Sequence, residues 1–284
     1  GVSAVRHTRV GLPFPTGGAY SSIGVEQDGG VLGGTGDYQK IDLEGRWYTP
    51  LGSSGSKGRL GAGIQYVLGL TAKSGFIFGD ASAFPTDLYS MGGVQFGIPL
   101  RGYDEFSITP NGFDPTAGGS AASANSFGKS YAAFTVEAGA RLSQMVYVDA
   151  FFDAGNLYRT AREYDPTRLF RGAGFGAALI SPLGPIGIDL GYGFDRVDIN
   201  GAPAPGWKVH FKLGNFFDVW GEPLSVANVA GAKPRKGEHV AVWVDGSRYA
   251  GDPRAIELTQ HLDVTIEVVP PYAKPTPFTA WNGN

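Results

Sequence analysis

Few residues of this 284-residue chain have the types and spacing that catalysis or metal binding requires. The chain has no cysteine, which excludes a thiolate nucleophile, a thiolate metal site and a disulfide scaffold. His239 and His261 could ligate a metal ion, but they follow no metal-ligand spacing and are more simply ordinary surface or strand residues. Asp149 and Asp153 could act as an acid–base pair, although lining a hydrated cavity is the simpler interpretation. We therefore expect no catalytic residue, no metal and no cofactor, and interpret the protein as a non-enzyme.

Phosphate and nucleic-acid binding are not indicated either. Gly29-Gly30 and Gly33-Gly34 lie between strand-like segments, and no helix pattern follows them, as a phosphate-binding loop would need. The formal net charge of -3 is close to balance, so nothing argues for nucleic acid as a partner. No apolar stretch reaches the length of about 18 residues that a transmembrane helix needs.

The elements that would position these side chains are long segments in which apolar and polar residues alternate. In residues 186–195, Ile, Leu and aromatic side chains fall on one face, and Gly and Asp fall on the other. Residues 132–142, 146–153 and 207–217 repeat the pattern. Strands of soluble proteins usually run to about five or six residues, whereas a tilted strand needs about 9–11 residues to cross a bilayer. The pattern therefore favours an apolar face against lipid and a Gly-rich, charged face against a hydrated lumen.

The predicted fold is all-β, an antiparallel transmembrane β-barrel that is partial and is followed by a small β-rich tail. About ten strands are expected through Phe217, with residues 207–217 as a possible eleventh. Long connections at residues 99–129 and 155–171 alternate with short ones, which is the usual asymmetry of outer-membrane barrels. A soluble β-sandwich also alternates in this way and is the competing interpretation. The predicted strands lie near residues 2–8, 19–28, 38–48, 60–70, 71–79 (one strand with the preceding segment, or two), 90–98, 130–142, 145–154, 172–181 and 185–195.

Two motifs carry a resemblance to a known family. Arg101-Gly102-Tyr103 precedes a long Gly- and Ser-rich insertion, and residues 151–156 read Phe-Phe-Asp-Ala-Gly-Asn. These motifs resemble the loop motif and the wall motif of the BamA-like family of outer-membrane protein assembly factors. The resemblance implies that the loop folds into the lumen and that Arg101 meets Asp153, with Gly155 beside it, on the barrel wall. Strand alternation independently places Asp153 on the inward face, and Arg and carboxylate side chains form charge-assisted, often bidentate bonds.

Further matches follow in the order that the family has. Residues 172–176 and 181–189 look like its penultimate hairpin. Residues 207–217 look like its closing strand, in which the resemblance implies an assembly signal that includes Trp207, Phe211 and the terminal Phe217. The resemblance covers residues 1–217, but the chain supplies fewer strands than the family and lacks its POTRA repeats and first barrel strand. Gly1 also opens directly into a strand-like pattern, without a signal peptide. The resemblance therefore implies a fragment.

The composition changes after Phe217. Residues 218–239 are interpreted as a linker, which is basic and contains Pro and Gly over its last part. Residues 240–284 are expected to form a small β-rich tail, with a strand at residues 240–244, a hairpin turn at Asp245-Gly246 and an alternating segment near residues 264–268. The tail matches no family that we recognise, and its abrupt start is compatible with a natural fusion or an artificial join.

The resemblance implies a barrel assembly and insertion factor of the bacterial outer membrane. Its expected partners are outer-membrane lipid, client β-barrel proteins and periplasmic accessory subunits. Two other functions remain open from the sequence. One is a passive outer-membrane pore or transport barrel, and the other is a soluble β-sandwich binding protein.

Overall fold

A computed structural model of the chain divides into two compact units, Gly1–Gly214 and Asn215–Asn284. The boundary lies close to the predicted end of the barrel region at residue 217, which itself lies outside the described residues. The linker predicted at 218–239 lies almost entirely outside them as well. The structure describes residues 1–12, 14–29, 37–54, 63–81, 87–117, 122–143, 145–181 and 184–213 of the first unit, and residues 224–225, 228–229, 239–244, 247–249 and 264–267 of the second.

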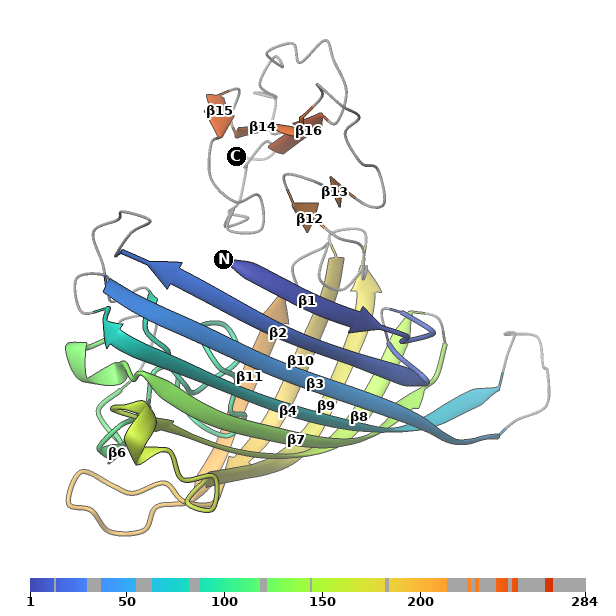
Figure 1. Ribbon diagram of the computed structural model, residues 1–284. Coiled ribbons are helices and arrows are strands. Elements are labelled where there is room, and N and C mark those ends of the chain that lie inside the picture. Colours follow the sequence, from blue (N-terminus) through green and yellow to red (C-terminus); the bar gives the residue numbers. More distant parts are fainter. Residues whose placement is uncertain are drawn as a thin grey trace, which may run out of the picture. The chain divides into compact units, whose positions relative to one another are not determined.

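The first unit is built on a nine-stranded sheet in which every neighbouring pair of strands is antiparallel (Figure 1). Its order is β1-β2-β3-β4-β7-β8-β9-β10-β11, so β1 and β11 are the edges and the described strands do not close into a ring. The prediction of an all-β, antiparallel, partial barrel is confirmed. The strands are β1 (Val2–His7), β2 (Gly18–Asp28), β3 (Asp37–Ser54), β4 (Ile64–Asp80), β7 (Ser130–Arg141), β8 (Val146–Tyr158), β9 (Phe170–Ser181), β10 (Gly184–Gly193) and β11 (Gly206–Leu213).

The two faces of the sheet differ as the alternation predicts. On β8, Phe151 and Asp153 are 4% and 2% exposed, whereas Phe152 between them is 42% exposed. On β10, Asp189 is 1% exposed and its neighbour Ile188 is 49% exposed. The carboxylates thus face the concave side, and large apolar side chains cover the convex side, which is the arrangement of a barrel with lipid outside.

One strand prediction is wrong, and one alternative left open by the sequence is decided. Residues 60–79 were expected to form one strand or two, and the structure has one, because β4 runs unbroken from Ile64 to Asp80. Residues 90–98, predicted as a strand, form only isolated bridges such as Met91 with Ile98. The reason is local, since Gly92, Gly93 and Gly97 have φ angles of 120°, 64° and 71°, which turn the chain back on itself.

The described part of the segment between β4 and β7 lies against the concave face and contributes a large share of the apolar core. We call its residues 87–117 the inner loop; they include β5 (Ile108–Thr109) and β6 (Gly112–Phe113). Met91, Leu100 and Tyr103 of this loop are at most 1% exposed and pack with strand residues such as Ile77 and Leu157. The apolar core therefore lies between the inner loop and the wall.

Helices contribute little to the described part of the chain. They are the 3-10 turns η3 (Ala124–Ser126) and η4 (Ala161–Glu163). Neither of them, nor any other helix among the described residues, is long and apolar enough to span a membrane.

The second unit contains short strands. β14 (Ala241–Val244) pairs with both β15 (Ser247–Tyr249) and β16 (Val264–Glu267), so the predicted strand and hairpin are present, while the two turn residues lie outside the described part. β12 (Leu224–Ser225) pairs with β13 (Asn228–Val229).

Candidate functional site

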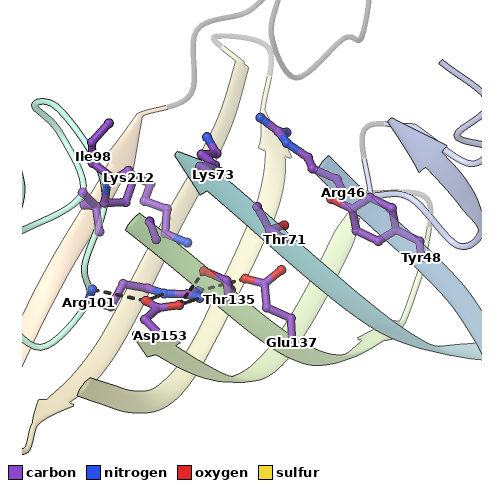
Figure 2. A pocket seen from close by; sticks show the side chains of 13 residues that line it. Arg46, Tyr48, Thr71, Lys73, Ile98, Arg101, Thr135, Glu137, Asp153 and Lys212 are labelled. Carbon is purple, nitrogen blue, oxygen red and sulfur yellow. Dashed lines mark hydrogen bonds and ion pairs between the residues drawn. The ribbon is translucent and has the colours of Figure 1, made fainter. Parts of the chain in front are cut away.

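Arg101 and Asp153 form a buried, bidentate ion pair between the inner loop and β8. The Nε and Nη2 atoms of Arg101 donate to the two Asp153 oxygens at 2.7 and 2.8 Å, and the Arg101 backbone N–H donates at 3.2 Å. The Thr135 hydroxyl on β7 donates to the same carboxylate at 2.9 Å. With Arg101 5% and Asp153 2% exposed, the structure brings the two predicted residues together in the geometry in which such pairs are strongest (Figure 2).

Further carboxylates surround the guanidinium. Its Nη1 atom lies 3.0 Å from Glu137, 3.6 Å from Asp149 and 3.8 Å from Asp189, which lie on β7, β8 and β10. The guanidinium also lies over the Phe151 ring, 3.5 Å from its centroid, as a cation–π contact. Burial by itself would lower the pKa of Arg101, but the hydrogen bonds and charge of Asp153, with the charges of Glu137 and Asp189, raise that pKa well above its usual value. The loop is thus anchored by a permanent cation in an acidic wall.

Glycines on β9 and β10 let the loop backbone come close to this wall. A Cβ atom added to Gly172 would lie 2.1 Å from the Arg101 carbonyl oxygen, and one added to Gly191 would lie 2.5 Å from the Gly102 nitrogen. Gly102 has a φ of 93°, and its own Cβ would lie 2.6 Å from the nitrogen of Gly193. Side chains at these positions would therefore hold the loop away from the wall.

Tyr103 and Gly155 complete the contact. The Tyr103 ring is fully buried, and its hydroxyl donates to the Arg171 carbonyl at 2.7 Å and accepts the Asp195 N–H at 3.2 Å. Burial raises the pKa of Tyr103 to about 12. A Cβ atom on Gly155 would lie 3.1 Å from Met91 Sδ, so this glycine of the predicted wall motif also faces the inner loop.

The predicted closing strand contributes differently. β11 carries Trp207 and Phe211 on the convex face, where they are 54% and 59% exposed. They lie apart from the Arg101 site, and Phe217 lies outside the described residues. The inward side of the same strand carries Lys208, His210 and Lys212, of which His210 accepts a hydrogen bond from the Gly102 N–H at 3.0 Å.

Glu137, Asp189 and His210 were not predicted as parts of this site. Alternation does place all three on the inward face, so the signal for their direction was present. Alternation does not indicate where Arg101 lies relative to strands that are far apart in the sequence.

A cavity of about 250 Å³ opens beside Arg101 on the concave face. Figure 2 shows Arg46, Lys73 and Lys212 on its lining with Glu137 and Asp153. Arg46 and Lys73 share the carboxylate of Glu44 at 2.6 and 3.0 Å. Charges of both signs on the lining are what a hydrated lumen requires.

His239 and His261, which the sequence favours as ordinary residues over metal ligands, can be followed only in part. His239 lies 3.0 Å from Arg248 Nη2, and His261 lies outside the described part. No group of three His, Cys, Asp or Glu side chains suited to a metal ion occurs among the described residues.

Comparison with known proteins agrees with this geometry. The family model of the Omp85 superfamily domain matches residues 1–217. The chain belongs to the Omp85 superfamily. Among solved structures, BamA from Haemophilus ducreyi, crystallised without POTRA domains 1–3, has a similar fold, with a TM-score of 0.52 and 16% sequence identity. The likeness covers 74% of this Omp85 chain and 41% of that BamA chain. No curated protein matches the sequence.

Residues 1–217 are therefore a BamA-like barrel segment of a bacterial outer-membrane protein. The large apolar side chains on the convex face of this Omp85 sheet are accordingly in contact with lipid. The soluble β-sandwich, which the sequence alone left open, is excluded by this family and fold.

Proposed function

We propose that this chain is the barrel part of a BamA-like insertase, a non-enzymatic factor that assembles client β-barrel proteins in the outer membrane. The observation that carries the proposal is the inner loop, which is anchored by Arg101 to Asp153 and occupies the concave side of the sheet. A passive pore needs its lumen open along its length, whereas this lumen is partly filled by a loop with a buried core. The fold likeness to a BamA supports the proposal.

The partners that we propose follow from the two faces of the sheet and from its edges. Outer-membrane lipid contacts the convex face. Client strands in an extended conformation are recognised by backbone pairing, for which exposed strand edges are a natural template. We propose that Trp207, Phe211 and Phe217 act as the closing-strand signal during assembly of this barrel itself, and that periplasmic accessory subunits assist insertion.

A passive pore or transport barrel is the second candidate function. The charged cavity beside Arg101 favours it, because a hydrated space of about 250 Å³ remains next to the docked loop. A pore conducts steadily through such a space, whereas an insertase keeps it closed until the loop moves.

Conductance and client assembly separate these functions. The wild-type protein and Arg101→Ala are each reconstituted in planar bilayers, and in vesicles to which an unfolded client barrel is added. The insertase proposal predicts low conductance for the wild type, higher or fluctuating conductance for Arg101→Ala, and faster client folding with wild-type vesicles than with empty ones. A large steady conductance that the substitution leaves unchanged, without any acceleration of client folding, would instead establish the pore.

A further inference from the structure

The inner loop is attached to the last strand of the sheet as well as to the Asp153 wall. Asp104 Oδ1 lies 2.5 Å from Lys208 Nζ, and the Gly102 N–H donates to His210 Nε2 at 3.0 Å. The Gln95 side chain also donates to the Phe211 carbonyl at 3.4 Å. The carboxylates that surround the Arg101 guanidinium lie on β7, β8 and β10. The three contacts between the inner loop and β11 therefore form a second attachment.

His210 is the buried member of this second attachment. It is 7% exposed, whereas Lys208 is about one-third exposed along its side chain. A backbone N–H can only donate, so His210 Nε2 must accept, and the neutral ring then carries its proton on Nδ1. A protonated ring has N–H groups on both nitrogens and would present one of them to the Gly102 N–H.

We propose that His210 is a positioning residue that fixes the inner loop to β11, and that it does so only while its ring is neutral. The inference deepens the proposed function, because in an insertase it would couple the docking of the loop to the position of the last strand. Protonation removes the acceptor and sets two donors against each other, so acidification loosens this attachment. The Arg101–Asp153 pair does not include the imidazole, so the two attachments can be tested separately.

Charged groups from each neighbouring element act on the ring. Burial has the largest effect and opposes protonation of the ring, as do the charges of Lys212 on β11 and Arg101 in the loop, whereas Asp189 on β10 and Asp104 in the inner loop favour it. Lys208, two residues along β11, is already paired with Asp104. Charges of both signs thus face the ring, and its burial opposes the charged form, so the attachment is expected to loosen only at acidic pH.

The test uses a single reactive thiol in the inner loop. The chain has no cysteine, and Ser107 is fully buried in the loop, so Ser107→Cys reports exposure of the loop through its rate of reaction with a water-soluble thiosulfonate. The rate is measured in lipid vesicles at pH 8 and pH 5.5, in the otherwise wild-type protein and with His210→Gln or His210→Phe. Gln keeps an acceptor at both pH values, and Phe has none at either. Heat-modifiable migration shows that each variant is folded.

We expect the labelling rate with His210, divided by the rate with Gln, to rise about tenfold from pH 8 to pH 5.5, the effect of losing one buried hydrogen bond. The Phe variant should label faster than the Gln variant at both pH values. The proposal is wrong if His and Gln respond identically to pH, or if Phe protects the thiol at pH 8 as well as His does. No client protein is present in this experiment, so its result does not depend on the proposed function. Client assembly can fail while the labelling result supports the role of His210, and client assembly can succeed while the labelling result refutes that role.

Discussion

Removing the Asp153 carboxylate should release the inner loop from the wall. Asp153→Ala deletes the acceptor of both Arg101 fork bonds, of the Arg101 backbone N–H and of the Thr135 hydroxyl. The buried guanidinium would keep only the Glu137 contact at 3.0 Å and the longer approaches to Asp149 and Asp189. Removing one partner of a buried ion pair typically costs about 3–5 kcal/mol. Because Glu137 still contacts the guanidinium, we expect a cost at the lower end of this range, about 3 kcal/mol. This cost corresponds to a more than hundredfold decrease in the equilibrium constant for docking of the loop.

Asp195→Ala is a matched control for this substitution. Asp195 binds Arg171 through Nε at 3.0 Å, Nη2 at 2.6 Å and the backbone N–H at 2.8 Å, the same three donors that Arg101 uses. The two pairs differ in burial, since the Arg171 side chain is 56% exposed and that of Arg101 is 6% exposed. Water screens the exposed pair, so the control should affect the loop far less.

Hydrogen exchange of the inner-loop amides in lipid vesicles measures the docking equilibrium directly. Asp153→Ala should lower the protection factors of residues 91–108 by about a hundredfold, following the energy above. The Asp195→Ala protein should remain close to the wild type. Equal losses in the two variants, or none in Asp153→Ala, would refute the claim that the buried pair anchors the loop.

Three further substitutions test other parts of the structure. Gly191→Ala should expose the inner loop to exchange because its Cβ would lie 2.5 Å from the loop backbone, whereas Gly187→Ala, whose Cβ meets nothing closer than 3.4 Å, should not. Arg101→Lys keeps the charge but loses the fork, and should reduce exchange protection by about ten- to a hundredfold; protection equal to the wild type would show that charge alone suffices. Phe175→Arg, at a side chain 65% exposed on the convex face, should lower the free energy of unfolding in lipid vesicles by about 2–4 kcal/mol. Thr71→Arg, on the lining of the hydrated cavity, is its control, and an equal loss there would contradict the assignment of the faces.

Strand direction could be predicted from the sequence because it follows from period-two alternation, whereas the anchoring pair was implied by the family resemblance. Asp153 is an odd-numbered residue in a strand whose even-numbered neighbours are apolar, so its direction is fixed by the pattern. Alternation and charge alone did not identify Arg101 as its partner. The family motifs pointed to the same two residues.

The remaining parts of the site depend on contacts that leave no local pattern. Gly172 and Gly191 allow the loop backbone to come close to the wall. A glycine in the sequence does not indicate which segment packs against it. Residues 90–98 alternate like a strand, but positive φ angles at Gly92 and its neighbours turn them into a loop. The Tyr103 hydroxyl bonds to backbone groups of Arg171 and Asp195, which no feature of the sequence indicates. His210 accepts a hydrogen bond from a backbone N–H. Every residue except proline has this group, so the sequence does not indicate which residue His210 contacts.

The central claim, that the inner loop is docked on the wall inside the membrane-embedded barrel, can be tested most directly by cross-linking in native outer membranes. Met91 of the loop lies 3.1 Å from the position of a Cβ on Gly155, so Met91→Cys with Gly155→Cys should join through a short bifunctional thiol reagent. The pair Ala138→Cys and Ala150→Cys, on directly paired residues of β7 and β8, is the positive control. We predict efficient cross-linking of both pairs. Cross-linking of the strand pair without the loop–wall pair would contradict the docked loop.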